Sequence, residues 1–456
     1  MTNQDLRSFV TQFQDAFPGE VIRVTEPISL EYDIQAILTE LERRRRFPIV
    51  FFENIKGQNI PIICNVYASR RGFALALGTD VARLPSVYAQ RLQEFFKPVV
   101  VEPSFRYSAL KGEQADLKRL PIPTFYPGDG GPYLTAGMLV ARDPDTGVHT
   151  MGYHRVQVKG PRQMCVSLHS RRRMFEYQRR AEERGKNLEC AVVLGLHPLV
   201  GMGALSYPPA EVSKFEAVGG LFQGPMEIAK CETIDVMTPA SAEIVIEGEI
   251  LAGVQEKEGP FGEFTGYFSR RSTGHVLAVK AIYMREKPWF QAIGSGRTYD
   301  HLLPLAVMRE AEILKAVRRV IPNVKAVHVP TSGGAAFTAF VSIRQTRPGE
   351  AKHVIPIVFG VDHYVKFVVI VDDDIDVLDE SDVLWAIATR VQADKDLIVI
   401  SESLGVILDP SATEQGLTAK IGIDATRPFG KEFGERLKMK PEKEAWAASF
   451  VDRMVG

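Results

Sequence analysis

Two glutamates five residues apart give the clearest chemical signal in the sequence. Glu258 and Glu263 enclose the spacer Gly-Pro-Phe-Gly, in which proline fixes its own φ and glycines can adopt φ values that other residues avoid. The proline also disfavours a helical conformation at Gly259, so the stretch predicts a rigid turn. Such a turn can separate the pKa values of two acids, one ionised beside a cation and the other kept protonated by burial as a proton donor. A hairpin loop with two solvated glutamates is the alternative interpretation.

An arginine in a strand-like stretch could complete this pair of acids. Arg155 lies within residues 150–157, and its planar guanidinium would suit a substrate carboxylate if it faced a concave site. An exposed surface charge is the more common fate of an arginine. The sequence contains no complete GxxxxGK[ST], GxGxxG, GxSxG or HExxH motif, which argues against phosphoryl transfer and serine hydrolysis.

The composition indicates an ordinary globular protein. The chain has 456 residues, of which 45% are hydrophobic and 24% charged, so we expect two to four domains. A net charge of -1 argues against nucleic acid and anionic membranes as partners. The four cysteines show no CxxC spacing, which argues for a reducing compartment; they are Cys64, Cys165, Cys190 and Cys231. We expect no secretory leader and no membrane span, and therefore a cytoplasmic protein.

The order of helical and strand-like patterns predicts separate folded parts. Residues 1–120 alternate between helix and strand patterns, and residues 121–300 show short strand-like runs between glycines, which favour a barrel or sandwich containing the acid turn. A linker helix is expected over residues 301–320, followed by a second α/β domain over residues 321–456. The charged helical tail from Lys431 is suited to packing against a partner subunit.

Several ordered blocks of the sequence resemble the UbiD family of reversible decarboxylases. Besides the acid turn, the likeness rests on residues 239–248 (Pro-Ala-Ser-Ala-Glu-Ile-Val-Ile-Glu-Gly), 373–377 (Asp-Asp-Ile-Asp-Val) and 383–390, and it runs from about Leu120 to Thr426. The resemblance implies an α/β plus β fold. Its parts would be an N-terminal α/β segment, a central split β-barrel of flavin-binding type, a linker helix and a C-terminal α/β oligomerisation domain that forms a homodimer or homohexamer.

The resemblance also implies a cofactor and a reaction. The cofactor would be prenylated FMN, made by a flavin prenyltransferase of the UbiX type, and it would act as an electron sink while the protein supplies orientation and electrostatics. The family's catalytic set falls on Arg155, Glu258 and Glu263. Arg155 would hold the substrate carboxylate and pair with Glu258, and Glu263 would deliver the proton that replaces CO2.

The implied function is that of a carboxy-lyase acting reversibly and without net oxidation on a small-molecule acid. The substrate would be an α,β-unsaturated or (hetero)aromatic carboxylic acid. The alternative is a non-catalytic flavin-binding or assembly protein of the same fold.

The expected metal site departs from the family's pattern. The family anchors the cofactor phosphate with a divalent ion, Mn2+ or Mg2+, and with K+. Its Asn-His-Glu ligands fall here on Thr150, His169 and, with a one-residue shift from Phe215, Glu216. A hydroxyl is a poorer ligand than an amide carbonyl, so we expect weaker or rearranged metal binding. The residues expected to contact the cofactor are Thr150, Gly152, Leu168, His169 and Glu216.

Two further stretches have competing interpretations. Residues 204–208, Ala-Leu-Ser-Tyr-Pro, match the family's potassium-binding carbonyl loop, whereas a simple proline-terminated turn is the alternative. The three aspartates at 372–374 predict a solvated end of a strand and not a metal cluster.

Overall fold

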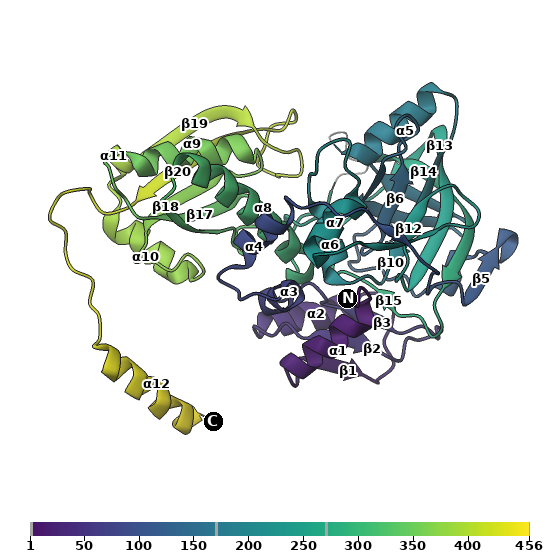
Figure 1. The fold of residues 1–456 in the computed structure, drawn as a ribbon, viewed down its shortest axis with the longest axis horizontal. Coiled ribbons are helices and arrows are strands. Elements are labelled where there is room, and N and C mark those ends of the chain that lie inside the picture. The colour runs from purple at the N-terminus through teal and green to yellow at the C-terminus, as the bar shows by residue number, and fades with distance from the viewer. Residues whose placement is uncertain (1–2, 169–171, 270–271, 456) are drawn as a thin grey trace.

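The computed structural model describes residues 3–168, 172–269 and 272–455 (Figure 1). The N-terminal part and a large β-rich part lie on one side, and a C-terminal α/β part lies on the other. The long helix α8 (Tyr299–Val320) connects them. This mixed α/β content agrees with the fold class expected from the sequence.

The N-terminal part is a small sheet covered by helices. Its strand order is β1-β2-β3-β15, so the last strand comes from a distant segment of the chain. The elements are α1 (Leu6–Ala16), β1 (Val21–Val24), α2 (Asp33–Arg43), β2 (Ile49–Phe52), β3 (Ile62–Cys64), α3 (Arg70–Leu77), α4 (Leu84–Arg91) and β15 (Phe290–Gln291). Apolar residues at helical spacing form the buried face of α1, which consists of Leu6, Phe9, Val10 and Phe13.

The central sheet follows the order β7-β6-β10-β13-β14-β9-β8, with β5 pairing beside β14. Its strands are β5 (Ser108–Lys111), β6 (Met138–Arg142), β7 (His149–Tyr153), β8 (Arg155–Gly160), β9 (Gln163–Ser167), β10 (Leu188–Leu194), β13 (Ile244–Glu258) and β14 (Ser272–Met284). The strands at the two ends of this path, β7 and β8, are separated in the chain by His154 alone. The sheet must therefore curl until its edges approach, although no β7–β8 ladder closes it among the described residues.

Both faces of this sheet are buried. In β10, Ala191 and Val193 belong to one hydrophobic cluster, while Cys190, Val192 and Leu194 belong to the other. This is why β10 is a continuous apolar run instead of an alternating one. Helices α5 (Arg173–Glu183), α6 (Pro198–Leu205) and α7 (Lys214–Phe222), and a three-stranded sheet of β4 (Val99–Val100), β11 (Glu227–Lys230) and β12 (Met237–Pro239), complete this part. All four cysteines are free and buried.

The C-terminal part contains a five-stranded sheet in the order β16-β17-β18-β20-β19. The elements are β16 (Val324–His328), β17 (Thr338–Ile343), α9 (Glu350–Val361), β18 (Phe367–Asp372), α10 (Glu380–Arg390), α11 (Ala393–Asp396), β19 (Leu397–Leu404) and β20 (Leu417–Ala425). β17, β18 and β20 run parallel, as expected for strands joined through helices. Across the described residues, no helix is both long and apolar enough to cross a membrane.

The last helix, α12 (Pro441–Val455), stands apart from the rest of the chain (Figure 1). Trp446, Phe450 and Met454 recur every four residues along it and are all exposed. An exposed apolar stripe of this kind suits a protein contact. The expectation that the tail packs against a partner subunit stays a prediction.

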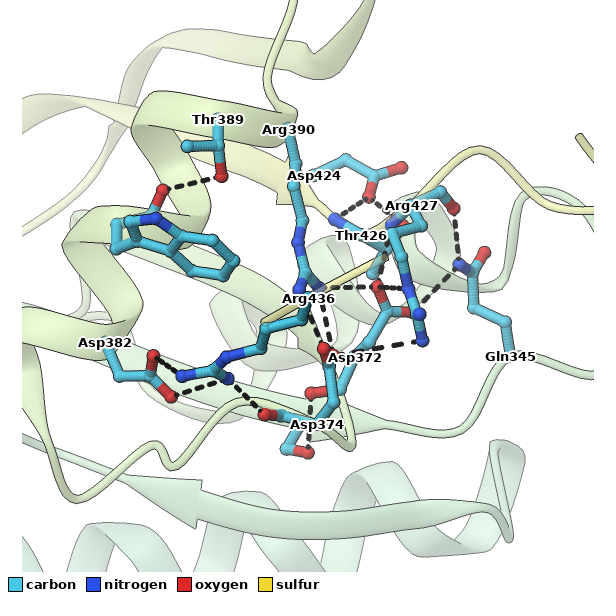
Figure 2. Close-up of polar contacts among 12 residues, drawn as sticks. Gln345, Asp372, Asp374, Asp382, Thr389, Arg390, Asp424, Thr426, Arg427 and Arg436 are labelled. Atoms are coloured by element: carbon cyan, nitrogen blue, oxygen red, sulfur yellow. Dashed lines mark hydrogen bonds and ion pairs between the residues drawn. The ribbon is translucent and has the colours of Figure 1, made fainter. Parts of the chain in front are cut away.

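A buried ion-pair network ties the end of β18 to the start of the tail (Figure 2). Asp372 accepts hydrogen bonds from Nη1 of Arg390, at 2.8 Å, and from the backbone N–H of Arg427, at 2.7 Å. Arg390 also pairs with Asp374, at 2.9 Å. The prediction of a solvated strand end is therefore wrong for Asp372, because Arg390 approaches it from α10. It holds for Asp373, which is exposed and pairs with Arg344.

We expect Asp372→Ala to destabilise the protein far more than Asp373→Ala. The first change removes one of the two carboxylates that pair with Arg390, which is only 2% exposed, and leaves the backbone N–H of Arg427 without its acceptor, so it should cost roughly 3 kcal/mol. The second removes a pair with Arg344, which is 67% exposed, and should cost about 1 kcal/mol or less. Chemical denaturation measures both. Equal losses in the two variants would contradict the role given to Asp372.

Candidate active site

The structure brings Arg155, Glu258 and Glu263 into direct contact. Arg155 is the first residue of β8, and Glu258 is the last residue of β13. Nη2 of Arg155 lies 2.5 Å from Oε2 of Glu258, and Nη1 bonds to the Glu263 carboxylate. Glu258 is fully buried and Glu263 nearly so. The two acids are thus not solvated, and one guanidinium serves both.

The turn between the acids is fixed by close backbone contacts. Gly259 has φ +83°, a conformation that favours glycine, and a Cβ at Gly130 would lie 2.5 Å from the Gly259 carbonyl oxygen. Gln157 accepts a hydrogen bond from the N–H of Gly259 (3.2 Å) and donates one to the carbonyl of Gly130 (2.6 Å). Because Arg155 and Gln157 are two residues apart on β8, they share one face of the strand and hold the turn at two points.

The two carboxylates have different surroundings. Glu258 also accepts hydrogen bonds from the hydroxyls of Tyr133 (3.0 Å) and Ser272 (3.2 Å), which fix its orientation. Glu263 borders a cavity. Tyr133 and Ser272 were not found from the sequence, because isolated hydroxyl residues far apart in the chain carry no spacing signal.

Burial and charge set the protonation of this group. Burial raises the pKa of Glu263, and the nearby Glu258 raises it further, although Arg155 opposes the shift. Burial lowers the pKa of Arg155, but the two carboxylates outweigh that effect and raise it overall. The arrangement therefore favours a charged guanidinium beside an acid, Glu263, that is able to hold a proton.

The cavity lies where the N-terminal part, the central sheet and α8 meet. Its apolar walls include Leu134, Leu205, Phe261 and Ile293, and its polar groups include Arg155 and Glu263. The cavity surface is more apolar than polar, and charged and hydroxyl side chains converge on it from several elements, as in small-molecule sites.

The start of α8 contributes an unexpected acid. Asp300 is fully buried, borders the cavity and accepts the backbone N–H groups of Asn65 (2.9 Å) and Tyr67 (2.7 Å). Burial raises its pKa to about 7, although the two N–H groups oppose the shift. The sequence shows an acid in the first turn of a helix, and nothing there distinguishes it from a solvated N-terminal charge.

One cation, Arg172, borders the cavity on the side of α6, and a second, Lys214, lies behind the cavity wall there. Arg172 and Ala204 line it, and Nζ of Lys214 donates hydrogen bonds to the carbonyls of Ala204 (2.7 Å) and Ser206. Burial lowers the pKa of Lys214, and the neighbouring Arg172 and Arg173 lower it further. A group of cations with this arrangement is the natural place for an anion.

The remaining predicted site residues lie around this region. Thr150 and Gly152 are in β7, Thr150 is buried, and Leu168 follows β9 and packs against the core. Glu216 lies in the first turn of α7, where its Oε2 accepts the N–H of Ser213 at 2.8 Å in a capping box. His169 lies outside the described residues.

The described side chains do not fit a divalent-metal site. Among residues 3–168, 172–269 and 272–455, no group of three or more His, Cys, Asp or Glu side chains is placed to hold a metal ion. The Glu216 carboxylate is engaged by its own helix cap, and the Lys214 ammonium already sits on the carbonyls expected to bind potassium. No step of the chemistry below is therefore assigned to a metal.

A buried Arg-Glu-Glu set beside a cavity is an arrangement that can bind an anion and hold a transferable proton. The sequence matches three family descriptions: the N-terminal domain of 3-octaprenyl-4-hydroxybenzoate carboxy-lyase (residues 16–92), its Rift-related domain (99–298) and its C-terminal domain (304–425). The chain belongs to the UbiD family of carboxy-lyases, which are decarboxylases.

Known relatives match the chain over nearly its whole length. Anhydromevalonate phosphate decarboxylase from Methanothermobacter thermautotrophicus is 34% identical over 418 residues, which cover 91% of this chain and 96% of the relative. The UbiD-class enzyme HmfF from Pelotomaculum thermopropionicum, solved in complex with FMN, is 34% identical with a TM-score of 0.92, covering 98% of this chain and 100% of that one. The 3,4-dihydroxybenzoic acid decarboxylase AroY from Klebsiella pneumoniae is 26% identical with a TM-score of 0.89, covering 98% and 99%.

The raised pKa of Asp300 predicts a specific pH dependence of stability. Its folded pKa of about 7 lies above its ordinary value of 3.8, so between these values the folded protein holds a proton that the unfolded chain does not. The stabilisation is full below the ordinary value and is lost as the pH rises through about 7. The variant Asp300→Asn has no carboxyl group at this position and therefore lacks this pH-dependent stabilisation. The free energy of unfolding of the wild type, relative to Asp300→Asn, should therefore be larger at acidic than at alkaline pH. Parallel stability curves from denaturation across that range would contradict the assignment.

Proposed function

We propose that this chain is a reversible, non-oxidative decarboxylase of an α,β-unsaturated or (hetero)aromatic carboxylic acid that works with prenylated FMN. The observation that carries the proposal is the contact of Arg155 with two buried glutamates at the wall of the cavity. The relatives support the cofactor and the reaction, because HmfF has been solved with FMN and with prenylated FMN. AroY and the anhydromevalonate phosphate enzyme are named as decarboxylases.

The residues of the cavity suit a flavin. The curled central sheet would act as a flavin-binding split barrel, with the ring system against the apolar walls and Arg155. The phosphate would lie on the cationic side formed by Arg172 and Lys214. When bound, prenylated FMN supplies the electron-accepting chemistry that decarboxylation requires.

The protein's own residues bind the substrate and handle the proton. Nε of Arg155 is buried without a hydrogen-bond partner among the described residues, so it can donate to a substrate carboxylate. Glu258, fixed by Tyr133 and Ser272, keeps the guanidinium in place. Glu263 borders the cavity, and its raised pKa favours the protonated form, so it can protonate the carbon that loses CO2. In the carboxylation direction the same group takes the proton back.

Two partners belong to this proposal. A flavin prenyltransferase of the UbiX type would supply the cofactor. A second copy of the chain would complete a homodimer or homohexamer, with the exposed stripe of α12 as its contact, and sedimentation velocity would give the size of the assembly.

Cofactor dependence tests the proposed function directly. Purified after expression alone, the protein should carry little flavin or plain FMN and release no CO2 from aryl or acrylic acids. After co-expression with a prenyltransferase it should show a modified flavin spectrum and decarboxylate at least one acid of such a panel. Full activity with plain FMN would exclude the prenylated cofactor. Absence of any bound flavin under all conditions would contradict the function as a whole.

The two acids should give different mutant profiles. Glu263→Gln keeps the shape of the side chain but removes the transferable proton, so turnover should fall roughly 10²–10⁴-fold while the cofactor stays bound. Glu258→Gln should disturb Arg155, so both substrate binding and rate should suffer, whereas exchange of the product proton with solvent should be less affected than in Glu263→Gln. Steady-state kinetics and deuterium exchange measure these quantities. Near-normal turnover and exchange in Glu263→Gln would assign the proton to another group.

A further inference from the structure

Lys214 is a buried cation whose charge the protein does not neutralise. It is the first residue of α7 and is almost fully buried, and within the described residues it forms no ion pair with a carboxylate. The charged groups that act on it are Arg172 and Arg173, which carry the same sign. The other buried cations have an opposite charge nearby: Arg309 pairs with Asp362 at 2.8 Å, and Lys420, which forms no ion pair in the described part of the chain, is still attracted by the charge of Asp362. Burying an unpaired charge is costly, so an anion from outside the chain would stabilise the ammonium form of Lys214.

The ammonium group sits where a small cation would otherwise bind. Its Nζ donates to two carbonyl oxygens, those of Ala204 and Ser206, at the C-terminal end of α6. An ammonium has three protons, so one donor remains after these two bonds. Ala204 borders the cavity, so the ammonium lies directly behind the part of the wall that Ala204 forms.

A second cation shares the same surroundings. The Arg172 guanidinium, which lines the cavity, lies 5.3 Å from the centre of the Tyr207 ring, and Nζ of Lys214 lies 5.8 Å from the same ring. Arg173 braces the connection between α6 and α7 by donating to the carbonyls of Pro208 (2.5 Å) and Val212 (2.8 Å). Arg173 thus holds in place the segment that follows the carbonyls of Ala204 and Ser206.

We propose that Lys214 is the built-in cation for the phosphate end of the cofactor cavity. Its ammonium replaces a potassium ion on the carbonyls of Ala204 and Ser206 and, together with Arg172, neutralises the flavin phosphate. Retention of the flavin then requires neither potassium nor a divalent metal. This inference rests on the proposed function, since it concerns the flavin of that site. It also accounts for the engagement of Glu216 in a helix cap, because a site with its own cation does not need that carboxylate as a metal ligand.

A purely structural role for Lys214 is the competing explanation, because a lysine can cap the carbonyls at the C-terminal end of a helix. Lys420 offers a matched control. Its Nζ also donates to two carbonyls, those of His363 (2.9 Å) and Val365 (2.8 Å), and it is equally buried, but it lies in the C-terminal part.

The experiment measures the affinity of full-length protein for FMN by flavin fluorescence, in sodium buffer with a chelator and after addition of potassium or Mn2+. The wild type should bind equally well in all buffers, and mass spectrometry should find no stoichiometric Mn2+. Lys214→Met should weaken binding roughly 10–100-fold, the equivalent of one charged hydrogen bond. Lys420→Met should lower stability and leave FMN affinity unchanged.

Lys214→Ala adds a rescue test. Removal of the side chain frees the two carbonyls, so binding lost in sodium should be regained in potassium, which the wild type does not need. A wild type that requires potassium or Mn2+, or a folded Lys214→Met variant with unchanged affinity, would overturn the inference while leaving the proposed function intact. Failure of the wild type to bind FMN in any buffer would instead contradict the proposed function. If Lys214→Ala does not fold, the wild type and Lys214→Met still decide the question.

Discussion

The rest of the site depends on one guanidinium that is shared by two buried carboxylates. A single positive charge cannot neutralise two negative charges, and the surrounding protein screens them poorly. The imbalance is relieved if one carboxyl group keeps a proton. The hydroxyls of Tyr133 and Ser272 stabilise Glu258 as the partner of Arg155, whereas burial favours the protonated form of Glu263. In the proposed function the proton would be held by Glu263, the acid of the pair that borders the cavity.

The cavity beside this group is polarised along its length. Acidic residues of the turn meet Arg155 at the central sheet, while Arg172 and Lys214 gather beside α6. In the proposed function, an anionic end of the ligand would be favoured on the side of Arg172 and Lys214, so fixed charges of the protein would help to orient it. The apolar walls would add affinity with little directional preference.

Periodic and local features could be predicted from the sequence, whereas contacts between distant segments could not. Helices α1 and α8 follow from apolar spacing, and the acid turn follows from its glycines and proline. The backbone contacts of the acid turn could not be predicted, since they involve Gly130 and Gln157 from other segments of the chain. β15 has two residues and no periodicity, yet it completes the N-terminal sheet. The role of Lys214 was hidden because spacing alone does not show that its ammonium reaches carbonyls of the preceding helix.

The short link between β7 and β8 has a consequence for how this site can change during evolution. Only His154 separates the strands, and both Arg155 and Gln157 hold the acid turn from the same face of β8. Side chains alternate between the faces of a strand, so inserting or deleting one residue would turn both away from the acids. The link must therefore keep its length if Arg155 and Gln157 are to stay on the face of β8 that meets the acids. The cavity walls that α6 and α8 contribute are less constrained, because there a side chain can be exchanged without shifting Arg155 or the two acids.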